Sequence, residues 1–358
     1  MMKTVLILGG TGAMGTHLVN LLNKMGGGKC VVTTRKHIDN YGNVEYIQGN
    51  AQDDSFLLPL LRSRRWTAIV DFMAYSTADY ARRFPELLAN TDQLIYLSSS
   101  RVYAESAGPI TEDSPRLLDV CEDKTYTSTD EYALAKARQE NMLRNSGNSN
   151  WTIIRPYITF SQYRLQLSSL EKEYWLKRAL DGKTIVFSKN LADKTTTFTY
   201  GEDVARGIAA VIGRKEALGE AFHITTGQHY RWSELLEVYL NAIEEKTGKR
   251  PRVLFTDNWQ DFYGGGNWQV KYDRLFNRVF DNSKINQFID TSTFNDTKQA
   301  LSHCVKSFID NPRFLNINWQ SEAKKDRLTG EWTNPLKIPG WKQKVNYLLI
   351  RLGLYHRR

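Results

Sequence analysis

Short apolar runs alternate with segments of helical periodicity from the start of the chain. The apolar runs, each bounded by turn residues and interpreted as strands, are 4–8, 30–33, 68–72, 94–97 and 152–154. Helical periodicity is found over 14–25, 54–61 and 130–144. Such alternation is typical of a parallel sheet with helices on both of its faces. We therefore predict an α/β fold with a doubly wound parallel sheet.

The regular alternation loosens after Ser168. The pattern there predicts a helix over 168–180, strands over 184–187 and 196–199, a helix over 202–212, a strand over 221–225 and a helix over 232–246. Beyond Gly248 the composition changes, because five of the nine tryptophans lie there and Gly264-Gly265-Gly266 forms a break. We interpret these later segments as insertions that build a smaller C-terminal region over the sheet.

The end of the chain is basic and amphipathic. After Leu336 it carries no acid and six basic residues, namely Lys337, Lys342, Lys344, Arg351, Arg357 and Arg358. Four apolar residues fall at helical spacing, namely Val345, Leu348, Leu349 and Leu352. We predict a terminal amphipathic helix, which usually packs its apolar face on its own domain or on a partner subunit. Peripheral contact with an acidic membrane is the alternative.

A glycine-rich segment lies between the first predicted strand and the first predicted helix. Its spacing is Gly9-x-x-Gly12-x-x-Gly15. Glycines in this context let the backbone approach a pyrophosphate at a helix N-terminus, so the segment predicts a dinucleotide site. The residues expected to bind the cofactor here are Gly9, Thr11, Gly12, Ala13, Met14 and Gly15.

This motif sets the expected domain organisation. We predict that residues 1–165 form the dinucleotide-binding domain and that later sheet elements return to it at about 196–226. Residues 166–195 and 227–358 are expected to form the substrate-binding region, which includes the basic amphipathic tail.

The end of the second predicted strand bears on the choice of cofactor. An NAD site usually places an acid there against the ribose hydroxyls, whereas this chain has Arg35 and Lys36. These cations could hold a 2′-phosphate, so NADP is favoured over NAD. The alternative is that Arg35 stacks on the adenine of either cofactor.

Tyr132 and Lys136 lie four residues apart in a predicted helix, where such residues share one face. A tyrosine with a pKa of about 10 is a poor base at neutral pH, but a neighbouring ammonium favours the phenolate. Upstream, Ser98, Ser99 and Ser100 follow a predicted strand. The order of glycine motif, serine segment and Tyr-x-x-x-Lys carries more weight than any one of these motifs alone.

This order resembles the extended branch of the short-chain dehydrogenase/reductase superfamily, the NAD-dependent epimerase/dehydratase family of nucleotide-sugar epimerases and their relatives. The resemblance covers about residues 3–247 and implies a Rossmann-like fold. It implies that Ser99, Tyr132 and Lys136 are catalytic, and that Lys136 also holds the nicotinamide ribose. Segments similar to the family's cofactor contacts add four candidate cofactor-binding residues, namely Asn50, Ala51, Tyr132 and Tyr157.

Departures from the family's pattern bear on the reaction. The 4,6-dehydratases of this branch need an Asp-Glu pair after the catalytic hydroxyl, and those positions here are Ser100 and Arg101. Dehydration is therefore disfavoured, and an epimerase or a reductase acting on a sugar nucleotide is expected, with the epimerase favoured. Many members that use UDP-sugars carry an Arg near Thr196, which this chain lacks. The sugar and the nucleotide stay open.

The formal net charge of +9 favours an anionic partner. An RNA-binding protein on the same scaffold is the alternative function, because the chain also resembles the basic plastid stem-loop RNA-binding members of the superfamily. A redox regulator that senses the NADP state is a third hypothesis. Neither needs intact Ser99, Tyr132 and Lys136, so a nucleic-acid partner is disfavoured and a small-molecule substrate is expected. A homodimer stays open.

The chain has three cysteines, and they lie far apart without ligand spacing. The six histidines lack paired acids at metal-ligand spacing. The apolar run after the N-terminus is too short for a signal segment. We expect a cytoplasmic protein without a metal site.

Overall fold

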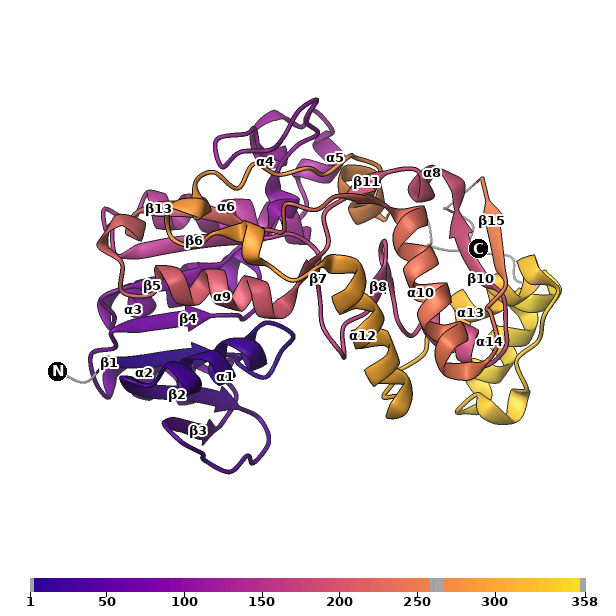
Figure 1. Cartoon of the computed structure of the whole chain (residues 1–358), viewed down its shortest axis with the longest axis horizontal. Coiled ribbons are helices and arrows are strands. Elements are labelled where there is room, and N and C mark those ends of the chain that lie inside the picture. Colours follow the sequence, from indigo (N-terminus) through magenta and orange to yellow (C-terminus); the bar gives the residue numbers. More distant parts are fainter. Residues whose placement is uncertain (1–2, 258–259, 261–266, 355–358) are drawn as a thin grey trace. The chain divides into compact units, whose positions relative to one another are not determined.

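The computed structural model describes residues 3–257, 260 and 267–354, and the chain folds into two compact units (Figure 1). The first unit contains Met1–Ser161, Thr197–His229 and Arg278–Thr297. The second unit contains Gln162–Thr196, Tyr230–Asn277 and Lys298–Arg358. The chain thus returns to the first unit twice, whereas we expected a single return at about 196–226. Trp259, the Gly264-Gly265-Gly266 break, Arg357 and Arg358 lie outside the described residues.

A seven-stranded sheet in the order β13-β6-β5-β4-β1-β2-β3 forms the centre of the first unit. Every neighbouring pair of its strands is parallel. The strands are β1 (Lys3–Leu8), β2 (Gly28–Thr34), β3 (Val44–Gln48), β4 (Ala68–Asp71), β5 (Leu94–Leu97), β6 (Trp151–Pro156) and β13 (Glu220–Ile224). The chain winds outward from β1 to β3, crosses to β4 and winds the other way. The predicted doubly wound α/β fold is confirmed.

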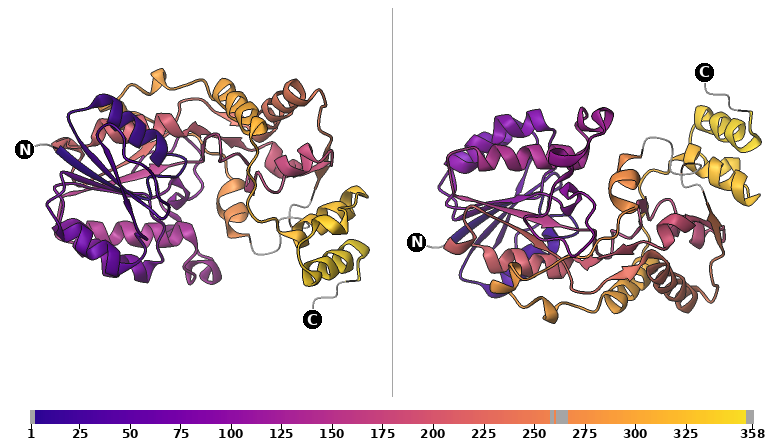
Figure 2. Two further views of the ribbon diagram at one scale, coloured as in Figure 1. Left: turned by 90° about the horizontal axis from the view of Figure 1, so that it is seen from below. Right: turned by 90° about the horizontal axis from the view of Figure 1, so that it is seen from above.

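Helices cover both faces of this sheet (Figure 2). They are α1 (Gly15–Met25) and α9 (Gly201–Val211) on one face, and α2 (Asp54–Arg62), α3 (Thr77–Ala89) and α6 (Tyr132–Arg144) on the other. Leu18 and Ile208 are fully buried in one core layer, and Leu57 and Leu87 in the other. Because both faces are covered, β4 and β5 are buried along their whole length. In the sequence β5 is a continuous apolar run, and β4 is apolar up to its last residue, Asp71.

Two of the longer elements of the first unit, β3 and α3, were not predicted. In β3, at the edge of the sheet, only Val44 is buried, so the strand lacks an apolar run. In α3 a proline, Pro85, lies inside the helix and the sequence is polar on average. A proline in a helix interior removes a backbone donor and usually predicts a break. Tertiary packing determines both elements more than their local sequence does.

The second unit is built mainly from helices, with a small parallel pair formed by β10 and β15. Its longer elements are β10 (Ile185–Ser188), α10 (Trp232–Thr247), β15 (Val253–Thr256), α12 (Thr297–Asp310), α13 (Trp319–Thr329) and α14 (Trp341–Leu352). Short elements of the chain are η1 (Ser100–Val102), α4 (Leu117–Val120), α5 (Lys124–Thr127), β7 (Thr159–Phe160), β8 (Gln166–Leu167), β9 (Leu170–Glu171), α7 (Leu176–Leu180), α8 (Lys189–Ala192), β11 (Thr195–Thr196), β12 (Thr199–Tyr200) and β14 (Tyr230–Arg231). Across the described ranges, no helix is both long and apolar enough to span a bilayer.

Two sequence predictions near the unit boundary were wrong. The expected helix over 168–180 is helical only in α7. Ser168 turns the chain with a φ of 56° between β8 and β9, and the residues from β9 to α7 form turns. The expected strand over 196–199 is two separate strands. β11 pairs with β14, whereas β12 pairs with β7, so the chain passes from one unit to the other between them.

Candidate active site

The glycine-rich segment links the end of β1 to the start of α1. Gly9 has a φ of +74°, a conformation that residues with a Cβ rarely adopt. A Cβ on Gly15 would lie 2.7 Å from the backbone of Gly10, and one on Gly10 would lie 2.6 Å from Cγ1 of Val32. These glycines let α1 and β2 approach the loop. A Cβ on Gly12 would meet nothing closer than a carbonyl oxygen at 3.9 Å, so the protein leaves space on that side.

The N-terminus of α1 has the features of an anion-binding site. Met14 precedes the helix without a side-chain cap, and the first turn contains no acid. The Thr16 amide donates to the Gly12 carbonyl oxygen at 3.1 Å, but no side chain caps the helix, and its dipole favours negative charge at this end. Together with the space beside Gly12, this arrangement fits the diphosphate of a dinucleotide.

An open cavity of about 310 Å³ lies beside this loop, at the carboxyl ends of the strands where the strand order reverses. Ligands of doubly wound sheets bind at this position. Six residues predicted to bind the cofactor line it, namely Gly9, Thr11, Gly12, Arg35, Asn50 and Ala51. The other predicted residues are not part of its lining, namely Ala13, Met14, Gly15, Lys36, Tyr132, Lys136 and Tyr157.

Sequence reasoning missed part of this lining. Phe72, Met73 and Ala74 line the cavity directly after β4, and Thr33 lines it from β2. The Thr33 hydroxyl accepts a hydrogen bond from the Gly9 amide at 3.3 Å and so attaches the loop to the neighbouring strand. The sequence could have indicated the residues after β4. They follow the strand next to β1 on the other side of the point where the strand order reverses, and ligands of such sheets bind at that point.

The rim of the cavity carries a cation and no acid among its described lining residues. Arg35 is exposed and lines the cavity, whereas Lys36 is exposed but does not. Asn50 is also exposed, and its side-chain oxygen accepts from the Gln52 amide at 3.1 Å. The lining thus offers one guanidinium group and several neutral hydrogen-bonding groups to a ligand.

Three consecutive serines follow β5, and their hydroxyl groups have different partners. Ser98 donates to Glu140 Oε1 at 2.6 Å, and Ser100 donates to the carbonyl oxygen of Arg155 at 2.7 Å. The hydroxyl protons of Ser98 and Ser100 are therefore both used in hydrogen bonds within the protein. Ser99 Oγ instead accepts from a backbone amide two residues further on, at 3.2 Å. Of the three, Ser99 is therefore the serine suited to donate to a substrate oxygen.

Lys136 is buried and points at the end of β5. Its Nζ donates to the carbonyl oxygen of Leu97 at 2.7 Å and lies 4.6 Å from the ring centroid of Tyr96 and 5.9 Å from that of Tyr132. Burial lowers the pKa of Lys136 to about 8, although the negative charge of Asp71 acts in the opposite direction. The ammonium group is thus fixed beside the Tyr132 ring.

Tyr132 begins α6 and is 41% exposed. The guanidinium carbon of Arg101 lies 5.2 Å from its ring centroid. Glu131 caps the helix by accepting from the Ala133 amide at 2.8 Å and also forms an ion pair with Arg101. The phenol therefore lies at the surface of the first unit, near two cations. One is Lys136 of the same helix, and the other is Arg101, which follows the three serines.

A buried carboxyl group that the sequence analysis missed also lies near Lys136. Asp71 ends β4, and its Oδ1 accepts from the Met73 amide at 3.0 Å and the Tyr75 hydroxyl at 3.2 Å. Its Oδ2 has no hydrogen-bond partner among the described atoms. Burial raises the pKa of Asp71 to about 6, against the effect of the Met73 hydrogen bond and the Lys136 charge. An acid at the end of a predicted buried strand could have indicated this residue from the sequence.

Tyr157 follows β6 and is buried, with its ring centroid 5.2 Å from that of Phe280. The structure therefore places this predicted cofactor residue in an aromatic contact outside the cavity lining. Within the part of the chain that the structure describes, no three His, Cys, Asp or Glu side chains come together as a metal site would require.

Comparison with known proteins gives the fold and the family. A UDP-glucose 4-epimerase from Lactobacillus helveticus is 30% identical over 31% of this chain and 40% of its own length. An epimerase from Methanothermobacter thermautotrophicus matches with a TM-score of 0.65 at 18% identity, over 86% of this chain and 93% of that one.

A UDP-glucuronic acid 4-epimerase from Bacillus cereus, solved with UDP-glucuronic acid and NAD, has a TM-score of 0.65 at 16% identity over 86% of this chain and 99% of that one. At such identities these structures show the fold alone. The family model described as the NAD dependent epimerase/dehydratase family matches residues 5–225, which include the glycine loop, the serine segment and Tyr132 with Lys136. The chain belongs to this NAD-dependent epimerase/dehydratase family.

Proposed function

We propose that this protein transfers hydride between an NAD(P) cofactor and a nucleotide sugar, with Ser99, Tyr132 and Lys136 as its catalytic residues. The arrangement at the end of β5 carries this proposal. Lys136 is fixed to the carbonyl of Leu97, two residues before Ser99, and lies beside the Tyr132 ring. The substrate class is supported by the names of the relatives, which include a UDP-glucose 4-epimerase and a UDP-glucuronic acid 4-epimerase.

Each of the three residues has its own role at the reacting hydroxyl group. A bound NAD(P) would supply the hydride acceptor for a substrate carbon and the donor that returns the hydride. Tyr132 takes the proton of the hydroxyl on that carbon and gives it back in the reverse step. Lys136 stabilises the phenolate and holds the ribose, and Ser99 donates a hydrogen bond to the reacting oxygen.

An epimerase is the reaction that these residues support best. Elimination of water needs a further acid and base beside the catalytic hydroxyl. Ser100 and Arg101 occupy the two positions after Ser99, and both are engaged within the protein, one with the Arg155 carbonyl and the other with Glu131. Epimerisation needs only reversible hydride transfer and the Tyr132 proton, so it requires nothing that the site lacks.

Mass spectrometry of small molecules released by denaturing the purified protein tests this proposal. An epimerase regenerates its cofactor in each cycle, so we expect a retained oxidised dinucleotide. A site that is empty after purification and fills with NADPH would indicate a reductase instead. A protein that binds neither NAD nor NADP would refute both forms of the proposal.

We further propose that Arg35 selects NADP over NAD. Arg35→Ala should weaken NADP binding by roughly 1–3 kcal/mol and change NAD binding much less, because a charge-assisted hydrogen bond to the 2′-phosphate is lost. Titration calorimetry with both cofactors measures the difference. Lys36→Ala is the matched control, since Lys36 does not line the cavity. Equal losses of NAD and NADP affinity in Arg35→Ala would reduce Arg35 to an adenine-stacking residue.

Two glycine substitutions separate binding from folding. Gly12→Ala should leave thermal stability unchanged, because its Cβ would meet no protein atom closer than 3.9 Å, but should weaken dinucleotide binding by about 1–3 kcal/mol. Gly15→Ala should destabilise the fold itself, since its Cβ would lie 2.7 Å from the Gly10 backbone. Thermal unfolding and cofactor titration distinguish the two effects. Unchanged cofactor binding in Gly12→Ala would mean that no ligand approaches the loop there.

A further inference from the structure

The helix α14 packs against its own unit through only one of its sides. Tyr347 and Ile350 are buried in a small core with Ala323 of α13 and with Ile338. The Tyr347 hydroxyl donates to Asp326 Oδ2 at 2.6 Å. The terminal helix predicted from the sequence is therefore present, but its buried residues are not the four apolar residues that we expected to form its packed face.

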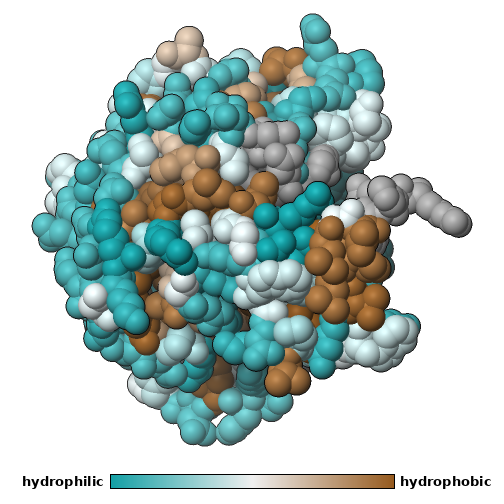
Figure 3. All heavy atoms as spheres, turned by 90° about the vertical axis from the view of Figure 1, so that its right-hand side faces the viewer, coloured by the Kyte–Doolittle hydropathy of each residue, from teal (hydrophilic) through white to brown (hydrophobic). Residues whose placement is uncertain are grey.

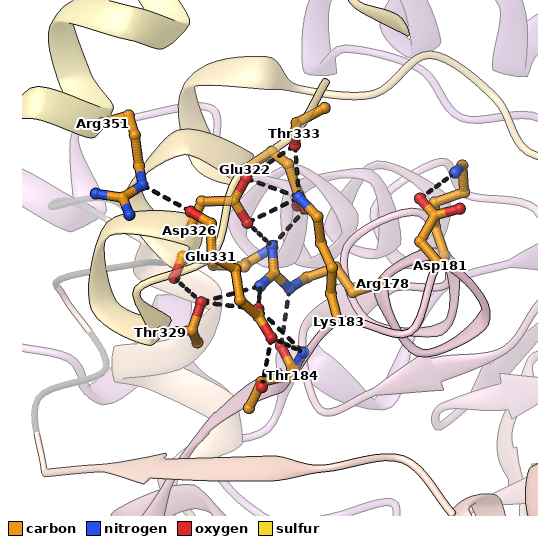
Figure 4. Close-up of polar contacts among 12 residues, drawn as sticks. Arg178, Asp181, Lys183, Thr184, Glu322, Asp326, Thr329, Glu331, Thr333 and Arg351 are labelled. Carbon is orange, nitrogen blue, oxygen red and sulfur yellow. Dashed lines mark hydrogen bonds and ion pairs between the residues drawn. The ribbon is translucent and has the colours of Figure 1, made fainter. Parts of the chain in front are cut away.

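A buried ionic cluster holds the α13–α14 pair in place (Figure 4). Arg178 of α7 is fully buried and donates to Asp326 at 2.8 Å and Glu331 at 2.9 Å, and it also pairs with Glu322. Lys183 donates to the second oxygen of Asp326 at 2.7 Å. Because these charges are removed from water and paired with one another, α13 and α14 form a fixed part of the second unit.

The opposite side of α14 is apolar and exposed. Trp341 is 70% exposed, Val345 44% and Leu352 55%. Leu349 is half-buried beside them, and Leu348 is half-buried because it also packs against the core around Tyr347. These five residues recur at intervals of three and four positions, so they share one side of the helix. We call them the α14 stripe. Figure 3 shows the face of the molecule that carries α14, with hydrophobic side chains gathered at its surface.

Positive charge borders the α14 stripe. Lys342 and Lys344 follow its first residue on the two flanks of the helix, and Lys337 lies exposed just before it. No acid occurs between residues 332 and 354. Arg351 is engaged, since its Nε donates to the Glu331 carbonyl and its guanidinium stacks on Trp332, and it serves to fix the helix.

We propose that the α14 stripe docks on the surface of an anionic lipid bilayer. An apolar stripe flanked by lysines and beginning with a tryptophan is the composition of helices that lie in the bilayer interface, with the apolar side chains in the acyl boundary and the cations at the head groups. A second copy of this chain fits less well. In a twofold contact the α14 stripe would face the same stripe of a second copy. Because residues 332–354 contain no acid, that copy would offer no carboxylate from this segment to Lys342 and Lys344.

Sedimentation with vesicles tests the proposal on the full chain. We expect binding to phosphatidylcholine vesicles that contain phosphatidylserine at low salt, and a marked loss of binding when the phosphatidylserine is omitted or salt is raised. Val345→Ser with Leu352→Ser, and separately Lys342→Gln with Lys344→Gln, should each weaken binding by roughly tenfold or more. Unchanged circular dichroism and turnover would show that both variants remain folded.

Matched substitutions elsewhere serve as controls. Val120 is 53% exposed on α4 and Lys249 is exposed after α10, so Val120→Ser and Lys249→Gln should leave vesicle binding unchanged. The proposal would be overturned if the wild-type protein did not bind anionic vesicles at low salt. Equal binding by the stripe variants would also overturn it. A wild-type dimer that the stripe variants convert to monomers, without vesicle binding, would assign the stripe to a second copy.

Discussion

Replacement of Tyr132 by Phe is expected to slow turnover by roughly 10²–10⁴-fold while leaving cofactor affinity nearly unchanged. The substitution removes only the hydroxyl group that exchanges a proton with the substrate. The ring of Tyr132 is 41% exposed at the first turn of α6, so the helix and its cap on Glu131 should form as before. Measurement of kcat and of dinucleotide affinity on the same preparation tests this expectation.

Lys136→Met is the companion variant, because Lys136 is assigned both to the phenolate and to the ribose. It should lower both turnover and cofactor affinity. Near-normal turnover in Tyr132→Phe with the true substrate would require a different proton acceptor and would remove Tyr132 from the mechanism.

Replacement of Arg178 by Leu is expected to cost about 3–5 kcal/mol of folding free energy. Arg178 is the fully buried cation between Glu322, Asp326 and Glu331, so its removal leaves buried carboxylates without their central partner. Burial by itself raises the pKa of Asp326, but hydrogen bonds led by that from Lys183 hold it below its usual value. The Asp326 carboxylate therefore remains charged at neutral pH. Denaturant unfolding, monitored by tryptophan fluorescence, measures the loss.

Arg250→Leu provides the control for Arg178→Leu. Arg250 also pairs with two acids, Glu237 and Glu244, but all three side chains are exposed to solvent. Exposed ion pairs contribute little, so this variant should unfold close to the wild type. Similar losses of stability in the two variants would mean that the buried cluster contributes no more to folding than a surface pair.

The sequence predicts the first unit well because its fold follows from local patterns. A buried parallel strand such as β5 is a continuous apolar run, and a glycine-rich segment between a strand and a helix is typical of a dinucleotide site. The edge strand β3 pairs with β2 on one side only and lacks an apolar run, and the proline-containing α3 packs against α6, which lies more than forty residues further along the chain. The return of Arg278–Thr297 to the first unit depends likewise on contacts that no local pattern reveals.

The same distinction applies to the candidate sites. The glycine loop and the Tyr132–Lys136 pair follow from spacing along the chain, and the structure places Lys136 beside Tyr132. Asp71 was missed because its proximity to Lys136 arises from the pairing of β4 with β5. The apolar residues of the C-terminal helix were correctly placed on one side. Which side is buried could not be predicted, because the buried ionic cluster around Arg178 positions the helix.

Epimerisation in deuterated water distinguishes hydride transfer from abstraction of the carbon-bound proton. Wild-type protein with its bound cofactor would be incubated with a panel of UDP- and dTDP-sugars, and the products analysed by proton NMR. Hydride transfer keeps the carbon-bound hydrogen out of exchange with water, while the Tyr132 proton exchanges freely. Hydride transfer to and from the cofactor should give a product inverted at one carbon, with no deuterium on that carbon. Deuterium on the inverted carbon, or no conversion of any nucleotide sugar with NAD or NADPH supplied, would contradict it.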